Sequence, residues 1–124
     1  MRAEAVSKHR GGMWAWLFQR VTAVLLIVML AIHLIVTHLY NIGKLNYETI
    51  GARVAHAGFT AVDIILLAAG IFHALNGLRM VLMDYWFTSR KRARILTIVF
   101  WVIGIVALVY GVWALWPWIG YQVR

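Results

Sequence analysis

Residues 73–85 read HALNGLRMVLMDY and lie inside the second of three long apolar segments of the chain. An imidazole, followed eleven residues later by a carboxylate and a phenol, is costly in hydrocarbon, so such groups normally face a bundle interior or a cavity. Eleven residues at about 100° each come within about 20° of three full turns, so His73 and Asp84 share one helix face. At about 1.5 Å rise per residue they stand roughly 16 Å apart, one near the membrane centre and one near its edge. Two polar side chains at two depths on one helix face, His73 and Asp84, predict a path for electrons or protons.

The composition around this stretch is that of an integral membrane protein. Of 124 residues, 64% are hydrophobic and 13% are charged, which leaves no room for a separate soluble domain. The absence of cysteine excludes disulfides, thiolate metal sites and cysteine catalysis, and leaves histidine and methionine as the softer metal ligands. The net charge of +8 comes from short basic clusters beside apolar runs, a pattern typical of membrane orientation, so we expect no nucleic-acid partner.

The expected fold is an all-α membrane protein, a single membrane-anchor domain over residues 1–124. Helices are predicted at about residues 14–40, 56–86 and 95–118, each long enough to span. Residues 41–55 are expected to form a short, mildly charged loop. Residues 90–94 carry four cations in five positions, so the positive-inside rule predicts a cytoplasmic N-terminus and a C-terminus outside.

The third segment carries no histidine or acid, which indicates a structural role. Its small residues and one leucine recur at spacings of three and four, at Gly104, Ala107, Leu108 and Gly111. Such spacing allows close contact with a neighbouring helix.

Polar residues elsewhere in the membrane segments also have simple structural interpretations. Arg20 either snorkels to the headgroups or takes part in a site. His33 and His38 are five residues apart, about 140° around a helix, so they cannot serve one site from one face. Asp63 is expected to contact water or the neighbouring loop rather than to transfer protons.

His73 needs a partner, because an unpaired polar group in hydrocarbon costs several kcal/mol. A haem iron is one such partner, and Gly70 and Gly77, one turn before and after, would leave space for a large flat ring. A hydrogen bond to a serine or a carbonyl on a neighbouring helix is the alternative. Spacing alone leaves both open.

Asp84 and Tyr85 fall where the second helix meets the cytoplasm. A quinone headgroup has two carbonyl oxygens that a tyrosine hydroxyl can donate to, and its reduction takes up protons that a carboxylate near water can relay. The alternative is an ordinary interfacial tyrosine and a solvated acid paired with Arg90 or Arg92.

The sequence of residues 73–79, HALNGLR, followed by Asp84 and Tyr85, resembles the second-helix motif of the hydrophobic membrane anchor subunit of succinate dehydrogenase. That enzyme is the succinate:quinone oxidoreductase of respiratory complex II, and the anchor is of the cytochrome b type. Residues 18–22, FQRVT, resemble the arginine-containing first-helix segment of the family. Length, three-helix topology and the basic second connection agree, so the resemblance covers most of the chain.

The resemblance implies particular roles. His73 would be an axial ligand of haem b iron, shared with a histidine of the companion anchor subunit. Tyr85 would bind the quinone, ubiquinone or menaquinone, with Asp84 handling protons nearby and Arg20 near the quinone and the haem propionates. Arg79 lies about 120° off the His73 face, and a propionate or the iron–sulfur subunit would be its contact.

The number of haems stays open. Residues 32–38, IHLIVTH, also resemble the first-helix segment of anchors that bind two haems, where the residue matching His33 ligates the outer haem. Single-haem relatives can carry a histidine there as well.

The expected function is therefore that of a multi-pass anchor in the cell inner (cytoplasmic) membrane, serving a complex of the tricarboxylic acid cycle and of electron transport. Its expected partners are the companion anchor subunit, the iron–sulfur subunit, the flavoprotein subunit, and membrane lipid. The chain has no flavin or iron–sulfur motif and no catalytic residue of its own for succinate oxidation. The alternatives are an anchor of a quinol:fumarate reductase and a haem-free structural or small transport protein.

Overall fold

The computed structural model describes residues 13–39, 46–86 and 89–119. Its elements are α2 (Met13–Leu34), the π-helical η2 (Ile35–Leu39), α3 (Tyr47–Ala55), α4 (Ala57–Tyr85), α5 (Arg90–Leu115) and the 3-10 turn η3 (Trp116–Trp118). Three stretches are long and apolar enough to cross a membrane, namely Met13–Leu39, Ala57–Tyr85 and Arg90–Trp118. The prediction of an all-α protein with three spanning helices is confirmed.

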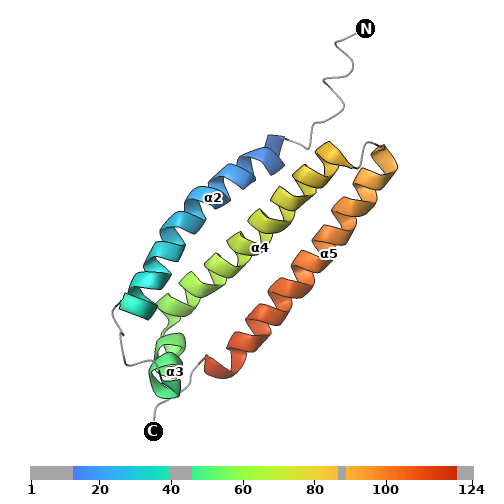
Figure 1. The fold of residues 1–124 in the computed structure, drawn as a ribbon. Helices are drawn as coiled ribbons and strands as arrows, with labels where there is room; N and C mark the ends of the chain where they lie inside the picture. Colours follow the sequence, from blue (N-terminus) through green and yellow to red (C-terminus); the bar gives the residue numbers. More distant parts are fainter. Residues whose placement is uncertain (1–12, 40–45, 87–88, 120–124) are drawn as a thin grey trace.

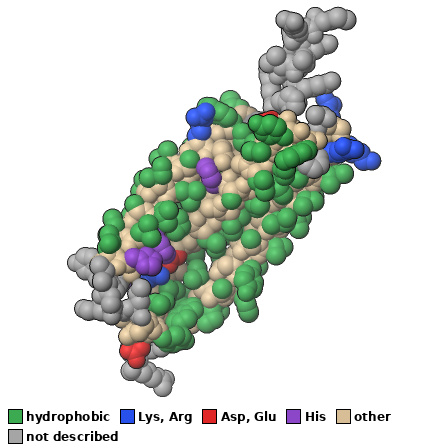
Figure 2. Space-filling view, in the orientation of Figure 1, with side chains coloured by type: hydrophobic (Ala, Val, Ile, Leu, Met, Phe, Trp, Pro, Cys, Tyr) green, Lys and Arg blue, Asp and Glu red, His purple; other side chains and the backbone are tan. Residues whose placement is uncertain are grey.

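The three long helices form one layer, with α4 in the middle and packed against both α2 and α5 (Figure 1). We call its two ends the Tyr85 end, where α4 leads to α5, and the α3 end, where α3 lies beside the start of α4. Hydrophobic side chains cover the visible lateral surface, and most Lys and Arg side chains gather near the Tyr85 end (Figure 2). Among the described residues the buried hydrophobic side chains are Val54 and Ala69 alone. A layer of this kind leaves broad apolar faces for lipid or for other subunits.

The connection after the first span is not a plain loop, and this expectation was wrong for residues 47–55. The Asn46 side chain accepts a hydrogen bond from Thr49 N at 2.8 Å, and Thr49 Oγ1 accepts one from Asn46 N at 3.1 Å. This reciprocal capping box satisfies two backbone donors and starts α3. Residues 41–45 of the expected loop, and residue 40 at the predicted end of the first span, lie outside the described part.

The third span begins earlier than the predicted residue 95. Arg92 N donates to Ser89 Oγ at 3.4 Å, so Ser89 caps a helix whose first turn contains the basic cluster. The cations are therefore helical, and they stand on α5 beside the end of α4.

Small residues bring α5 close to α4, as predicted. A Cβ atom at Gly111 would lie 2.5 Å from Leu67 Cδ2, and one at Gly104 would lie 3.2 Å from Leu75 Cδ1. Neither position has room for a larger side chain unless the neighbouring leucine moves. The two glycines therefore set the distance between the helices.

We expect Gly111→Val to destabilise the α4–α5 pair by about 1–3 kcal/mol, the usual cost of overpacking. Thermal inactivation of the purified complex measures this, and its midpoint should fall. Ala114→Val is the matched control, because Ala114 lies on the same helix and is exposed. Equal midpoints for the two variants would contradict the close contact at Gly111.

Candidate functional site

His73 lies at the interface of α4 with α2, half-buried, and its ring faces α2. Thr22 Oγ1 lies 3.2 Å from His73 Nδ1, and Gln19 Nε2 lies 3.3 and 3.4 Å from Nδ1 and Nε2. Gln19 Nε2 also donates to the backbone carbonyl of His73 at 3.1 Å. The ring therefore has polar partners on a neighbouring helix, as the hydrogen-bonding alternative requires, although they are a threonine and a glutamine.

The hydroxyl of Thr22 helps to decide which ring nitrogen carries the proton. Thr22 Oγ1 donates to the carbonyl of Phe18 at 2.7 Å, so its single proton is already engaged. Toward His73 the hydroxyl then acts as an acceptor, which favours a proton on Nδ1 and a lone pair on Nε2, the nitrogen that Gln19 Nε2 approaches to 3.4 Å. A metal-ligating imidazole has this form, with one nitrogen bonded to a polar neighbour and the other directed at the metal.

Gln19 is fixed in place by residues of the HALNG sequence. Asn76, which is buried, donates through Nδ2 to Gln19 Oε1 at 2.8 Å and to the carbonyl of Ala15 at 3.1 Å. A Cβ atom at Gly77 would lie 3.0 Å from Gln19 Nε2. Asn76 and Gly77 thus create the space that Gln19 occupies beside His73.

The expectation that Gly77 leaves an open face beside His73 was wrong within this chain, because Gln19 occupies the position above it. At Gly70 a Cβ atom would meet only Leu26 Cδ2, at 3.9 Å, and this glycine lines the pocket that His33 and Asp63 also line. Gly77 therefore serves the packing of α2 against α4. Sequence reasoning missed Gln19; the available signal was an amide three residues before Thr22, on the same face of an apolar helix.

The residues predicted to bind quinone lie near the Tyr85 end. Because α4 is continuous to Tyr85, Asp84 shares the side of the helix that bears His73. Tyr85 is 76% exposed, with its ring centroid 6.4 Å from that of Trp86. Asp84 is exposed and has no salt bridge to any residue in the described ranges, so the expected alternative pairing with the basic cluster is not found there.

Arg20 lies with its guanidinium carbon 4.4 Å from the centroid of the Trp16 ring, at the exposed surface of α2. This is a cation–π contact at the level where aromatic belts form. Within the described part of the chain, the structure shows no hydrogen bond or ion pair between Arg20 and Asp84 or Tyr85.

Arg79 points in another direction from His73. Its Nε donates to Thr97 Oγ1 on α5 at 2.8 Å, and Thr97 Oγ1 donates to the carbonyl of Ala93 at 2.8 Å. Both side chains line a groove of about 600 Å³ on one face of the layer. The 120° offset expected from the sequence thus places Arg79 toward α5 while His73 faces α2.

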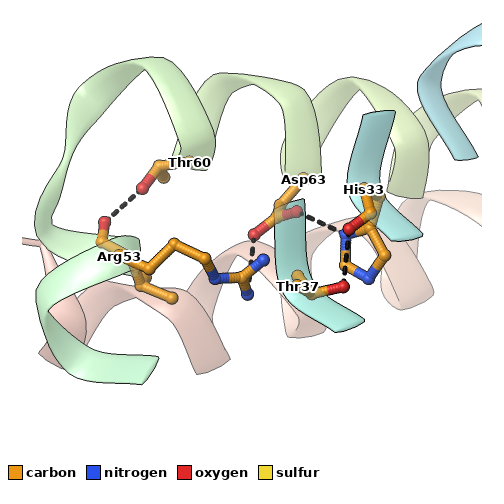
Figure 3. Close-up of polar contacts among 6 residues, drawn as sticks. His33, Thr37, Arg53, Thr60 and Asp63 are labelled. Carbon is orange, nitrogen blue, oxygen red and sulfur yellow. Dashed lines mark hydrogen bonds and ion pairs between the residues drawn. The ribbon is translucent and has the colours of Figure 1, made fainter. Parts of the chain in front are cut away.

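A second polar cluster joins three elements at the α3 end (Figure 3). His33 Nδ1 on the first span lies 2.9 Å from Asp63 Oδ1, and Arg53 Nη2 on α3 lies 3.5 Å from Asp63 Oδ2. Asp63 does contact the connection before α4, as expected, and it also holds His33. His33 and Asp63 line an open pocket of about 520 Å³. A second haem at His33 stays a prediction.

Comparison with known proteins gives a consistent result. Residues 2–112 match the family model described as succinate dehydrogenase/fumarate reductase transmembrane subunit. The succinate dehydrogenase hydrophobic membrane anchor subunit of Archaeoglobus fulgidus is 40% identical over 81 residues, covering 65% of this chain and 69% of that protein. The succinate dehydrogenase 2 membrane subunit SdhC of Mycobacterium tuberculosis is 29% identical over 102 residues, covering 81% and 73%.

A third relative, the hydrophobic membrane anchor subunit of Halobacterium salinarum, is 34% identical over 79 residues, covering 63% of this chain and 61% of that protein. No solved structure matches the chain at a significant level. The family model covers the first two membrane helices of the structure and most of α5. The chain therefore belongs to the family of succinate dehydrogenase and fumarate reductase transmembrane subunits.

Proposed function

We propose that this chain anchors a succinate-oxidising assembly in the membrane, holds one side of a haem b and contributes to the site where a quinone is reduced. The observation that carries the haem part is the environment of His73. Its Nδ1 lies 3.2 Å from a hydroxyl whose proton is already engaged, and this arrangement favours a lone pair on Nε2. An ionisable side chain held in this way in the middle of a spanning helix is normally functional.

The residues present fit a haem whose second axial ligand comes from another chain. His73 Nε2 would hold the iron, Thr22 would keep the Nδ1 proton in place, and Gln19 would brace the ring from the side. The bound group would supply a one-electron redox centre within the bundle. Within the described residues, His33 is engaged with Asp63, His56 caps α4 and His38 is exposed at the far end of the first span, so the opposite ligand is assigned to the companion anchor subunit.

The quinone part rests on Tyr85 and Asp84. The Tyr85 hydroxyl would donate to a quinone carbonyl oxygen, and the exposed Asp84 carboxylate would pass protons from water to the reduced ring. At 76% exposure, Tyr85 cannot by itself shield a ligand from water. A closed pocket needs a wall from another subunit, and Arg20 is proposed to take part once that wall is present.

The architecture supports a role inside a larger complex. A single layer of three helices with a small buried core has faces left for the companion anchor, while the Tyr85 end offers a polar surface to the iron–sulfur protein and, beyond it, the flavoprotein. The cations of residues 90–94 support placing that end in the cytoplasm, with the cytoplasmic membrane as the location. This chain then supplies attachment and cofactor ligands rather than succinate chemistry.

We expect Tyr85→Phe to lower succinate:quinone reductase activity of the purified complex about tenfold, because one hydrogen bond to the quinone is lost. Succinate oxidation with an artificial dye should stay unchanged, since that reaction ends before the membrane. The two assays on the same preparation make the measurement.

Tyr110→Phe is the matched control, because Tyr110 is an exposed tyrosine on α5 far from the Tyr85 end. An equal loss of both activities in the Tyr85 variant would indicate poor assembly. Unchanged quinone reduction would remove Tyr85 from the pocket and defeat this part of the proposal.

A further inference from the structure

The groove that Arg79 and Thr97 line runs between α2 and α5, with α4 as its floor. We call it the Arg79 groove. Its volume is about 600 Å³ and its lining is almost wholly apolar, with aromatic side chains including Trp14, Phe18, Phe72 and Trp101. Hydrocarbon fits such a lining. The Arg79 cation on its wall is costly in an apolar setting unless an anion pairs with it.

Arg79 has no acidic partner in the described residues. Asp63 is engaged with His33 and Arg53 at the α3 end, Glu48 lies on α3, and Asp84 has no salt bridge to any residue that the structure describes. The Arg79 side chain donates through Nε to Thr97 at 2.8 Å. That bond fixes the side chain through Nε and leaves the two terminal nitrogens, with four N–H donors, for another group.

The depth of Arg79 matches that of a lipid headgroup. Asn76 bonds to the carbonyl of Ala15 in the first turn of α2, and Arg79 lies about one turn further toward the Tyr85 end. Arg79 is therefore level with the beginning of α2, where Trp14 lies. Tryptophan marks the interface between headgroups and hydrocarbon.

Nearby charge selects for an anion over a neutral or zwitterionic group. Four cations occupy the first turn and a half of α5, and Thr97 follows them by one turn on the same helix. Their field raises the positive potential at the mouth of the groove. A guanidinium binds phosphate oxygens in a two-pronged fashion, which suits the free end of Arg79.

We propose that Arg79 and the Arg79 groove form a binding site for one anionic phospholipid. The phosphate rests on the terminal nitrogens of Arg79, and one hydrocarbon chain lies in the groove along α4, toward Ala68 and Leu108. Thr97 acts as a positioning residue that holds the guanidinium at the mouth. Thr22 and Asn76, which contact His73 and Gln19, also line this groove, and the lipid count below is a readout separate from haem or quinone content.

The test counts lipids on the purified complex. After washing in mild detergent, native mass spectrometry should show one more tightly held phosphatidylglycerol per copy of this chain in the wild type than in Arg79→Gln. In mixed micelles, the wild type should prefer phosphatidylglycerol over phosphatidylcholine at least tenfold, and Arg79→Gln should lose that preference. Thr97→Val should lower retention with the arginine still present, which covers the case where Arg79→Gln fails to assemble.

Arg90→Gln is the matched control, because Arg90 is an exposed cation at the start of α5 and does not line the groove. It should retain the lipid. Equal loss in the control would show a diffuse electrostatic effect and overturn the site. Arg79→Gln could instead leave the lipid content unchanged while it shifts the haem spectrum or releases another subunit. Arg79 would then contact a haem propionate or a carboxylate of a partner, and the lipid site would be overturned.

Discussion

Replacing His73 by leucine should remove the b-type absorption band of the complex while leaving succinate oxidation with an artificial dye intact. Leucine has a similar volume but no ligand atom, so the packing of α2 against α4 is largely kept. Met80 lies about two turns along α4 from His73, and its Sδ accepts from Asn76 at 3.7 Å. We therefore expect no replacement of the imidazole by another side chain, and a haem content that falls at least tenfold. A reduced-minus-oxidised visible spectrum with haem quantitation is the measurement.

His38→Leu provides the matched control, because His38 is exposed at the far end of the first span. Its spectrum should equal that of the wild type. An unchanged band in His73→Leu would defeat the haem assignment and leave a haem-free scaffold. If His33→Leu removes half of the haem, the complex holds a second haem at His33; one haem per assembly in the wild type excludes it.

The helices and their number followed from the sequence because membrane insertion depends on local apolar length, which a sequence displays directly. Boundaries were less certain because they depend on capping by single side chains. Asn46 and Ser89 start α3 and α5, and both lie in stretches whose charge alone favoured a loop. The Asn-x-x-Thr pattern at residues 46–49 was the available signal for α3.

The arrangement of side chains around His73 could be predicted only in part from the sequence. Helical periodicity relates residues of one helix, so it places Asn76 near the His73 face, but it does not say which helix lies opposite. The contact between Gln19 and His73 joins residues 54 apart and depends on how α2 packs on α4. For the same reason the role of Gly77 was misread: a missing side chain leaves space for a neighbour without identifying that neighbour, which here is Gln19.

The cluster at the α3 end was also predicted only in part. Asp63 was expected to contact water or the connection, and Arg53 of α3 does reach it, yet His33 on the first span was not foreseen. Asp63 joins α4 to the first span and to α3, and helical periodicity does not relate residues of different helices. Its energetic importance follows from that position.

We expect Asp63→Leu to destabilise the α3 end by about 3 kcal/mol, the lower part of the range for removing one partner of a buried ion pair. The side chains of His33, Arg53 and Asp63 are only 27%, 18% and 13% exposed, so water screens them weakly. The variant leaves the Arg53 cation without its carboxylate in a largely apolar setting. The midpoint of thermal inactivation of the complex should fall clearly below that of the wild type.

The double variant Arg53→Met/Asp63→Leu separates charge pairing from packing. If the cost comes from an uncompensated cation, removing that cation should restore more than half of the lost stability, because a buried pair is often replaceable by apolar side chains. Glu48→Gln is the matched control: Glu48 is an exposed acid on the same short helix and its loss should have little effect. Additive losses in the double variant would show that Arg53 and Asp63 act independently, and would contradict a stabilising charge pair between them.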